Sequence, residues 1–251
     1  MKYKSFLIIL SIISLGLLVK NSNAQSGEIR FLVKHKWTKK IAAVEYMSKA
    51  RREHYEYVWG NVAEYEEKSV LYYNSNAYRY EDVEDQSEYV GHSWRTSEYF
   101  IYRDLKQNTT YDVMRMLNKL YVIQDTIRYQ NWKMLNDMKE IAGHICMNAS
   151  YTDTIKDNDI VAWFALDLPI SIGPERFGGL PGMILEIDIN NGAMVITAEE
   201  IIEYESDTII EKPTHKKRIR QINEDEYNQL LIDYMDECIK EERPYFWGLR
   251  Y

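Results

Sequence analysis

Hydrophobic and polar residues alternate along much of the chain, which is the pattern of strands buried on one face. In residues 28–35, Ile29, Phe31 and Val33 fall on one side. Residues 70–80 hold two apolar runs separated by Asn74-Ser75-Asn76, which predicts a hairpin. Between these segments, residues 38–57 are rich in Ala, Lys, Arg and Glu, which predicts a helix.

The middle of the chain contains short runs rich in β-branched and aromatic residues, which predict further strands. These runs cover residues 99–103, 112–116, 120–125, 132–135, 140–149 and 158–168. We expect a turn at Asn136-Asp137-Met138-Lys139, between the fourth and fifth of them. The charged run 81–88 is typical of a solvated loop.

The clearest local pattern is a hairpin over residues 183–201. Alternating apolar residues lead into Asn191-Gly192, which favours a type I′ turn with positive φ at both positions. The chain then closes with a helix, because Asn223 and Glu226 have the spacing of a capping box. Apolar residues recur behind it at spacings of three and four as far as Cys238, which gives the helix one apolar face.

Many strands and few helices predict a mainly β protein with some α structure. We expect an antiparallel curved sheet or half-barrel, packed by a helix from the N-terminal half and by the C-terminal helix.

The N-terminus has the pattern of an export signal. Lys2 and Lys4 precede an apolar run of 14 residues, Phe6 to Val19, which is too short to span a bilayer. Small residues before Ala24 predict cleavage there, with an uncleaved anchor as the alternative. We therefore expect a signal peptide over 1–24, a single domain over 25–251, and a location in the periplasm, at the outer membrane or outside the cell.

The charge balance narrows the range of partners. The net charge of −8 becomes −11 once the three lysines of residues 1–24 are removed. An acidic chain is a poor partner for nucleic acid or an anionic membrane surface, both of which favour basic patches. We expect no transmembrane segment in the mature chain.

Cys146 and Cys238 are the two cysteines of the chain. In an oxidising compartment they are a candidate disulfide, which would close a long loop and stabilise the fold. The alternative is two buried free thiols, which are common core residues.

Glycine and proline crowd into residues 173–182, directly before the predicted strand that starts at Met183. Leu180-Pro181-Gly182-Met183 favours a type II turn, because proline presets φ at its second position and glycine accepts positive φ at its third. A rigid turn that feeds the next strand is the simplest interpretation. The segment has neither the dinucleotide-binding fingerprint nor the lysine of a P-loop.

The segment also resembles the signature of the GLPGLI family, a family of exported proteins of Gram-negative bacteria with no assigned activity. The matching residues are Gly173, Pro174, Phe177, Gly179, Leu180, Pro181, Gly182, Met183, Ile184 and Leu185. Met183 stands where the name-giving motif has leucine. The resemblance is strongest over 95–200, and it implies compartment and class rather than a reaction.

Candidate catalytic residues are few. His144 and Cys146 share one face of a predicted strand and could serve a thiol hydrolase, but no orienting third group or oxyanion site is visible. The other histidines lack ligand spacing and are expected at the surface, and so are acidic pairs such as Glu199-Glu200 and Asp157 with Asp159. We predict no catalytic residues, no metal and no cofactor, and the sequence favours a non-enzymatic role.

Aromatic residues are abundant, with 21 tyrosines and six tryptophans. They could line a cavity for an apolar or sugar ligand, or they could simply pack the core. The sequence thus favours a binding or carrier module for a hydrophobic ligand or an envelope partner. The alternatives are an assembly subunit that docks through Gly173–Leu185, and a hydrolase that uses His144 and Cys146.

The tripeptide Asp-Thr-Ile occurs three times, with its threonine at Thr126, Thr154 and Thr208. It resembles the acceptor site of an O-glycosylation system in related exporters, which implies exposed hydroxyls at these positions. Chance placement of a tripeptide that suits strands explains the pattern equally well.

Overall fold

The computed structural model describes residues 26–61, 64–83, 99–214 and 219–251, and the strands within these ranges form one sheet. The strands are β1 (Gly27–His35), β2 (Tyr65–Tyr73), β3 (Ala77–Asp82), β4 (Phe100–Asp104), β5 (Thr109–Met116), β6 (Lys119–Thr126), β7 (Lys133–Ile141), β8 (His144–Asp153), β9 (Asn158–Ala165), β10 (Met183–Ile189), β11 (Met194–Glu203) and β12 (Arg220–Ile222). The predicted signal peptide and residues 84–88 of the charged run lie outside the described residues.

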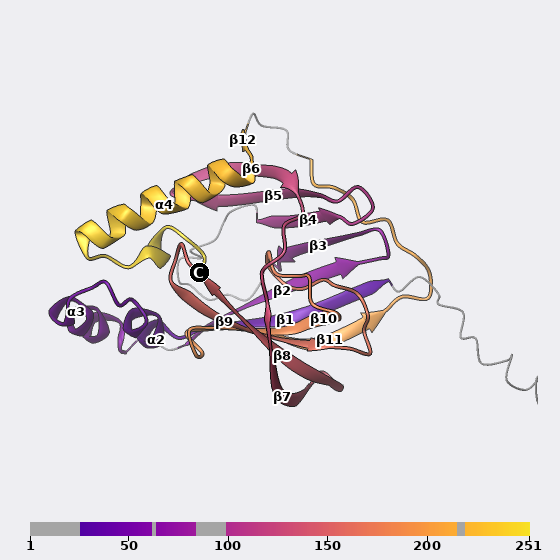
Figure 1. The fold of residues 1–251 in the computed structure, drawn as a ribbon, viewed down its shortest axis with the longest axis horizontal. Helices are drawn as coiled ribbons and strands as arrows, with labels where there is room; N and C mark the ends of the chain where they lie inside the picture. Colours follow the sequence, from indigo (N-terminus) through magenta and orange to yellow (C-terminus); the bar gives the residue numbers. More distant parts are fainter. Residues whose placement is uncertain (1–25, 62–63, 84–98, 215–218) are drawn as a thin grey trace, which may run out of the picture.

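The sheet is open and strongly curved, and its strand order is β12-β6-β5-β4-β3-β2-β1-β11-β10-β9-β8-β7 (Figure 1). The first described strand, β1, lies inside the sheet and pairs with β2 on one side and β11 on the other. Among the described strands the pairing is antiparallel, except that β12 runs parallel to β6. This confirms the prediction of a mainly β protein built on a curved antiparallel sheet.

The described helices are α2 (Trp37–Ala42), α3 (Lys49–Trp59), α4 (Glu224–Glu241) and the short 3-10 helix η2 (Tyr245–Trp247). The prediction of one helix over 38–57 is wrong, because the chain turns between α2 and α3. Val44 and Met47, which lie in this turn, are each 2% exposed and pack into a core cluster with α4 and η2. Burial of two apolar side chains outweighs the helix propensity of the stretch.

Helix α4 begins as the sequence predicts. The side chain of Asn223 accepts a hydrogen bond from the Glu226 backbone, and the Glu226 carboxylate accepts one from the Asn223 backbone at 3.0 Å. This capping box satisfies backbone donors that the first turn of a helix leaves without partners. The buried residues of α4 are Leu231, Tyr234, Met235 and Cys238, all from the predicted apolar face.

The predicted turn at 136–139 is wrong, since β7 continues through these residues as an edge strand with a register shift between Met134 and Met138. The backbone N–H of Asp137 bonds to the Asn148 side chain, 3.1 Å away, inside this irregularity. The chain reverses instead at Ala142 and Gly143, whose φ values are +49° and +85°. The polar residues whose pattern predicts a turn therefore lie in a β-bulge.

The hairpin of β10 and β11 is confirmed, with positive φ at Asn191 and Gly192. Asn190 also has positive φ, and the last strand pair is Ile189 with Met194, so the connection has four residues rather than two. The Gly192 backbone donates to the Asp188 side chain at 2.5 Å, which fixes the turn.

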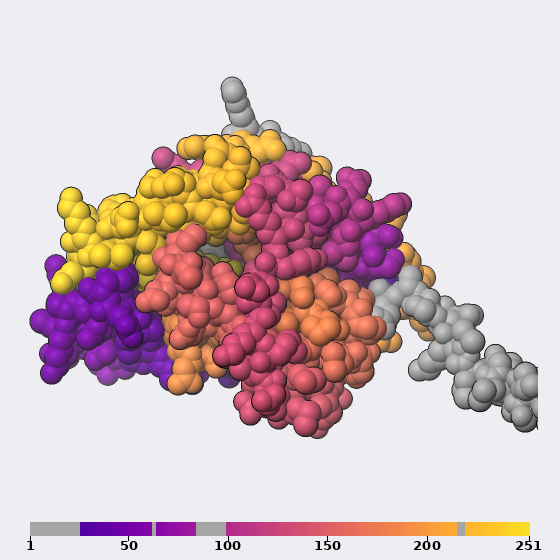
Figure 2. All heavy atoms as spheres, viewed as in Figure 1, coloured from indigo at the N-terminus to yellow at the C-terminus, as the bar shows by residue number. Residues whose placement is uncertain are grey.

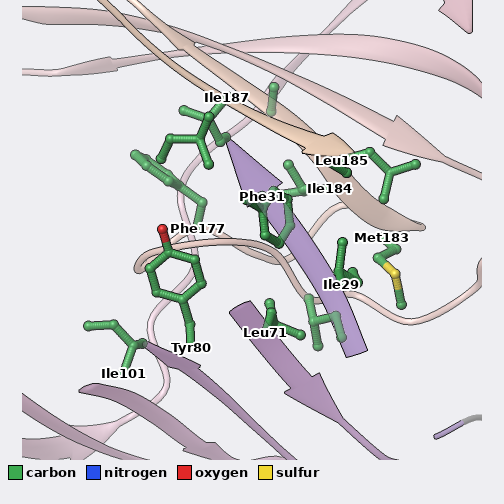
Figure 3. Packing of buried hydrophobic residues seen from close by; sticks show 14 of the residues in the cluster. Ile29, Phe31, Leu71, Tyr80, Ile101, Phe177, Met183, Ile184, Leu185 and Ile187 are labelled. Carbon is green, nitrogen blue, oxygen red and sulfur yellow. The ribbon is translucent and has the colours of Figure 1, made fainter. Parts of the chain in front are cut away.

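The main core lies between the sheet and the segment that precedes β10. Figure 3 shows Met183, Ile184, Leu185 and Ile187 packed beside Ile29, Phe31 and Leu71, with Phe177 reaching the same cluster from the 173–182 segment. A second cluster joins α2, α4 and η2 around Ile41, Val44 and Met235.

Of the two alternatives for the cysteines, the structure shows the buried free thiols and not the candidate disulfide. Cys146 on β8 is buried in the main core, and Cys238 on α4 is buried in the second cluster, so both are free thiols. Two thiols held in separate cores cannot reach bonding geometry without moving the backbone.

Within the described ranges, the helices are too short or too polar to cross a bilayer.

Candidate functional site

The glycine- and proline-rich segment connects β9 to β10 and packs into the interior. Of residues 173–182, all of which are described, only Gly179 and Pro181 are exposed. A docking role through this segment needs a solvent-facing surface, so the burial argues against that alternative. The segment instead sends two charged side chains, Glu175 and Arg176, into two separate polar networks.

Glu175 is fully buried and has positive φ. Its carboxylate accepts hydrogen bonds from the hydroxyls of Tyr80 and Tyr99 and is ion-paired with Arg250. Arg250 also forms two bonds to the Asp82 carboxylate, at 2.6 and 2.7 Å. Burial, reinforced by the Glu175 charge, raises the pKa of Tyr80 and of Tyr99 well above the usual phenol value, so both remain hydrogen-bond donors.

Arg176 joins the segment to the sheet and to α4. Its Nε donates to the buried Asp112 carboxylate on β5 at 2.9 Å, and its Nη2 donates to Glu224 on α4 at 2.5 Å. Arg103 on β4 pairs with the same Asp112. The guanidinium also lies 4.5 Å from the ring of Tyr227, so helix, loop and sheet share one charged centre.

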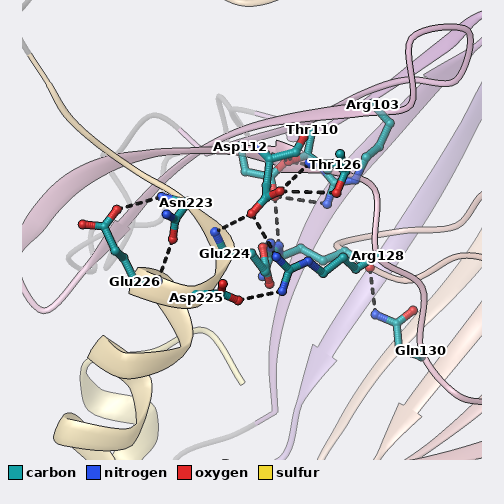
Figure 4. Close-up of polar contacts among 12 residues, drawn as sticks. Arg103, Thr110, Asp112, Thr126, Arg128, Gln130, Asn223, Glu224, Asp225 and Glu226 are labelled. Carbon is teal, nitrogen blue, oxygen red and sulfur yellow. Dashed lines mark hydrogen bonds and ion pairs between the residues drawn. The ribbon is translucent and has the colours of Figure 1, made fainter.

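The first turn of α4 is held to the sheet by a neighbouring set of bonds (Figure 4). The Glu224 backbone donates to Asp125 at 3.1 Å, and Arg128 bridges Asp125 and Asp225. Hydrogen bonds from the Thr126 and Glu224 backbones lower the pKa of Asp125. The position of α4 is therefore fixed by ionic contacts at its N-terminus as well as by its apolar face.

The type II turn predicted at Leu180–Met183 is wrong, because Gly182 lacks the positive φ that this turn demands at its third position. Gly182 is needed for a different reason. A Cβ there would lie 2.1 Å from the backbone oxygen of Ala165, where the segment passes close to the end of β9. Positive φ in this segment falls on Glu175 and Gly179 instead.

A hollow of about 240 Å³ opens between α4, the β8–β9 turn and the 173–182 segment. Figure 2 shows it between the yellow atoms of α4 and the coral atoms of the β8–β9 turn. Aromatic rings supply much of its wall: Tyr129, Tyr151, Phe177, Tyr227 and Tyr251. Charged side chains supply another part: Arg128, Asp153, Lys156, Arg176 and Glu224. The remaining wall residues are Gln130, Thr154, Ile155, Asn228 and Leu231.

The charges of this wall are balanced by direct pairing. Lys156 is 7% exposed and its Nζ lies 3.2 Å from the Asp153 carboxylate. Burial lowers the pKa of Lys156, and the charge of Asp153 opposes that shift. Arg176 is neutralised by Asp112 and Glu224, and Arg128 by Asp125 and Asp225. The hollow thus offers both donors and acceptors without a large net charge.

The thiol-hydrolase alternative finds no support at Cys146. Burial raises the pKa of this thiol to about 11, so the nucleophilic thiolate is disfavoured at neutral pH. Its Sγ lies 3.6 Å from the backbone oxygen of His144, and the ring of His144 bonds to Asp167 at 2.8 Å. Within the described residues, no group of three or more His, Cys, Asp or Glu side chains is arranged to hold a metal ion.

The remaining candidate residues divide by exposure. Thr126 and Thr154 are exposed as the glycosylation hypothesis requires, but the Thr208 hydroxyl is buried. Glu199, Glu200, Asp157 and Asp159 are exposed, as predicted. His54 is also exposed, whereas His92 and His215 lie outside the described residues.

His35 contradicts the surface prediction. It is 2% exposed and sits 3.0 Å from Glu67, between the rings of Trp37 and Tyr65. It continues the buried face of Phe31 and Val33 on β1, so the alternation along the strand, and not the spacing of the histidines, is the signal for its burial.

The hollow itself was not found from the sequence. Its residues come from five separate segments (128–130, 151–156, 176–177, 224–231 and 251), and chain spacing carries no sign that they meet. The one local signal is the Glu175-Arg176 pair, since two adjacent charges are unusual inside a glycine- and proline-rich turn between buried strands.

The fold and the hollow together define a β-rich domain with a small site of aromatic and charged residues beneath α4. A family model described as the N-glycanase peptide, N-terminal domain, matches residues 60–229, and the chain belongs to this family. The match covers β2 to β12 and the first part of α4, and so includes most of the hollow.

Two solved structures of PNGF-II, in different crystal forms, share the fold. One has a TM-score of 0.53 at 16% identity, and the other 0.52 at 15%. Each alignment covers 83% of this chain but 33% of the PNGF-II chain, so this chain spans about a third of the length of those proteins. The search of curated proteins found no match.

Proposed function

We propose that the chain is a binding module whose site is the hollow beneath α4, and that its ligand is a neutral, hydroxyl-rich molecule, such as one sugar ring of a glycan. One observation carries this proposal. The wall of the hollow combines five aromatic rings with charged side chains that already have ion-pair partners.

Paired charges suit hydroxyl groups. Asp153 and Glu224 present acceptors, while Lys156 and Arg176 present donors, and a hydroxyl group can donate and accept at once. An ionic ligand would have to compete with the partner that each of these side chains already has. The aromatic rings supply apolar faces against which the C–H faces of a sugar can pack.

Size supports the same class of ligand. Pockets for drug-sized ligands usually enclose about 300–1,000 Å³, and this hollow measures about 240 Å³. It is better matched to a single ring than to a lipid chain. The hydrophobic ligand expected from the aromatic content is therefore the less favoured candidate, and so is an apolar carrier role.

The family supports a glycan as ligand, since its description names an N-glycanase. We further propose that this chain is exported and acts in the cell envelope or outside the cell. This part rests on the N-terminal pattern and on the resemblance to the GLPGLI family.

The test is titration of the purified protein with glucose, galactose, mannose and N-acetylglucosamine, followed by NMR. Asn228→Phe should block the hollow from the α4 side and weaken binding about tenfold or more. Tyr151→Ala should weaken it by removing one ring of the wall. Tyr57→Ala is the matched control, because Tyr57 is 85% exposed on α3 and distant from the hollow in the chain. A protein that shows no shift with any of these sugars would end the proposal.

A further inference from the structure

A second, smaller cavity adjoins the hollow. It has a volume of about 30 Å³, which is roughly the space of one water molecule. The two cavities share five wall residues: Lys156, Arg176, Tyr227, Leu231 and Tyr251. Side chains that line both spaces form the partition between them.

Four of these residues are fixed by strong contacts. Arg176 is held by two carboxylates and Lys156 by Asp153, while Tyr227 and Leu231 belong to α4. Tyr251 belongs to no helix or strand. Its ring is held by Phe177, at a centroid distance of 5.7 Å, and by the ammonium of Lys156, 4.1 Å from the ring centroid.

The two residues that precede Tyr251 hold its ring in this position. Arg250 is anchored by Asp82 and Glu175, and both Arg250 and Leu249 line the smaller cavity without lining the hollow. The chain before Tyr251 therefore lies beside the smaller cavity, and Tyr251, which lines both spaces, stands between that cavity and the hollow.

We propose that Tyr251 is the specificity-determining residue of this site, because its ring closes the inner end of the hollow and limits the buried part of the ligand to one sugar ring. This inference rests on the proposed function. Without the ring, the hollow continues into the smaller cavity and gains the volume that the ring occupied. The site then has room for a second ring.

The experiment compares N-acetylglucosamine with its β-1,4-linked disaccharide by calorimetric titration. In the unmodified protein the two association constants should be similar, because the second ring stays outside the partition. In Tyr251→Ala the disaccharide should gain about tenfold over the monosaccharide. Tyr251→Phe keeps the partition and should keep the ratio near one, and Tyr57→Ala controls for loss of a tyrosine elsewhere.

The outcomes separate the two proposals. If the ratio of the disaccharide and monosaccharide association constants is the same in Tyr251→Ala and in the unmodified protein, the proposed role of Tyr251 is overturned. The proposed binding function then still holds. Failure of the unmodified protein to bind the disaccharide or any of the four monosaccharides tested above overturns the proposed function.

A second measurement does not depend on sugars. Phenol should enter the space left in Tyr251→Ala and raise its melting temperature by a few degrees, while leaving the unmodified protein unchanged. Equal response of the two proteins to phenol would contradict a partition made by this ring. Should Tyr251→Ala fail to fold, Tyr251→Leu removes less volume and serves for both measurements.

Discussion

Replacement of Glu175 tests whether the 173–182 segment is held in place by its buried charges. Glu175→Ala removes the carboxylate that accepts from Tyr80 and Tyr99 and pairs with Arg250. Breaking a buried ion pair from one side typically costs about 3–5 kcal/mol, because the remaining charge loses its partner. Arg250 keeps both bonds to Asp82, so we expect the lower end, about 3 kcal/mol.

The assay is urea unfolding followed by tryptophan fluorescence. The midpoint should fall with little change in slope, and the melting temperature should drop by about 6–12 °C for a domain of this size. Glu175→Gln keeps the shape and should lose less. A double-mutant cycle with Arg250→Met should return a coupling of about 0.5–3 kcal/mol between the two positions. A loss below about 1 kcal/mol for Glu175→Ala would refute the assignment of a structural ion pair to this segment.

Three further changes test separate parts of the structure. Gly182→Ala should destabilise the protein by about 1–3 kcal/mol in urea unfolding, because the added methyl overlaps the Ala165 backbone; an unchanged midpoint would rule out that close approach. Cys146 should react with a thiol reagent at pH 8 only after unfolding, since burial raises its pKa to about 11, and fast labelling of the native protein would disprove this. Asp125→Asn should destabilise the protein at pH 7. Because the folded pKa of Asp125 is lowered, its contribution is present above about pH 4 and disappears as the pH falls through the folded pKa, so an equal loss at pH 7 and pH 2 would contradict the assignment.

The features predicted correctly are those with a local chemical cause. The side chains of Asn223 and Glu226 bond to each other's backbones, so two residues at a spacing of three are enough to define the start of α4. Likewise, Asn191-Gly192 tolerates positive φ, and the apolar alternation on both sides places the β10–β11 hairpin.

The features that were missed depend on contacts between distant segments. The break between α2 and α3 follows from burial of Val44 and Met47 against α4, which the local helix pattern cannot reveal. Residues 136–139 form a bulge in the edge strand and not the predicted turn, because the Asn148 side chain accepts a hydrogen bond from the Asp137 backbone. The sequence correctly indicates that position 182 requires glycine. The reason is the close approach of the neighbouring strand, however, and not a positive φ.

The hollow belongs to the same class of missed feature. One of its charged pairs, Arg176 with Glu224, joins the 173–182 segment to α4, and another, Lys156 with Asp153, lies at the β8–β9 turn. Apart from Arg176, which stands beside Glu175 in the glycine- and proline-rich segment, each of these residues has the sequence pattern of ordinary surface charge. Only the fold brings them into one wall.

The position of β1 inside the sheet affects how the chain folds and how truncated fragments of it behave. Its two neighbours are β2, which follows soon after, and β11, which ends at Glu203 near the far end of the sequence. Until β11 is present, one side of β1 exposes a row of unpaired backbone groups beside the apolar residues Ile29, Phe31 and Val33. Such an edge is a template for pairing with other chains. Fragments that stop before Glu203 should therefore aggregate rather than fold, and the sheet should form late and as a unit rather than strand by strand.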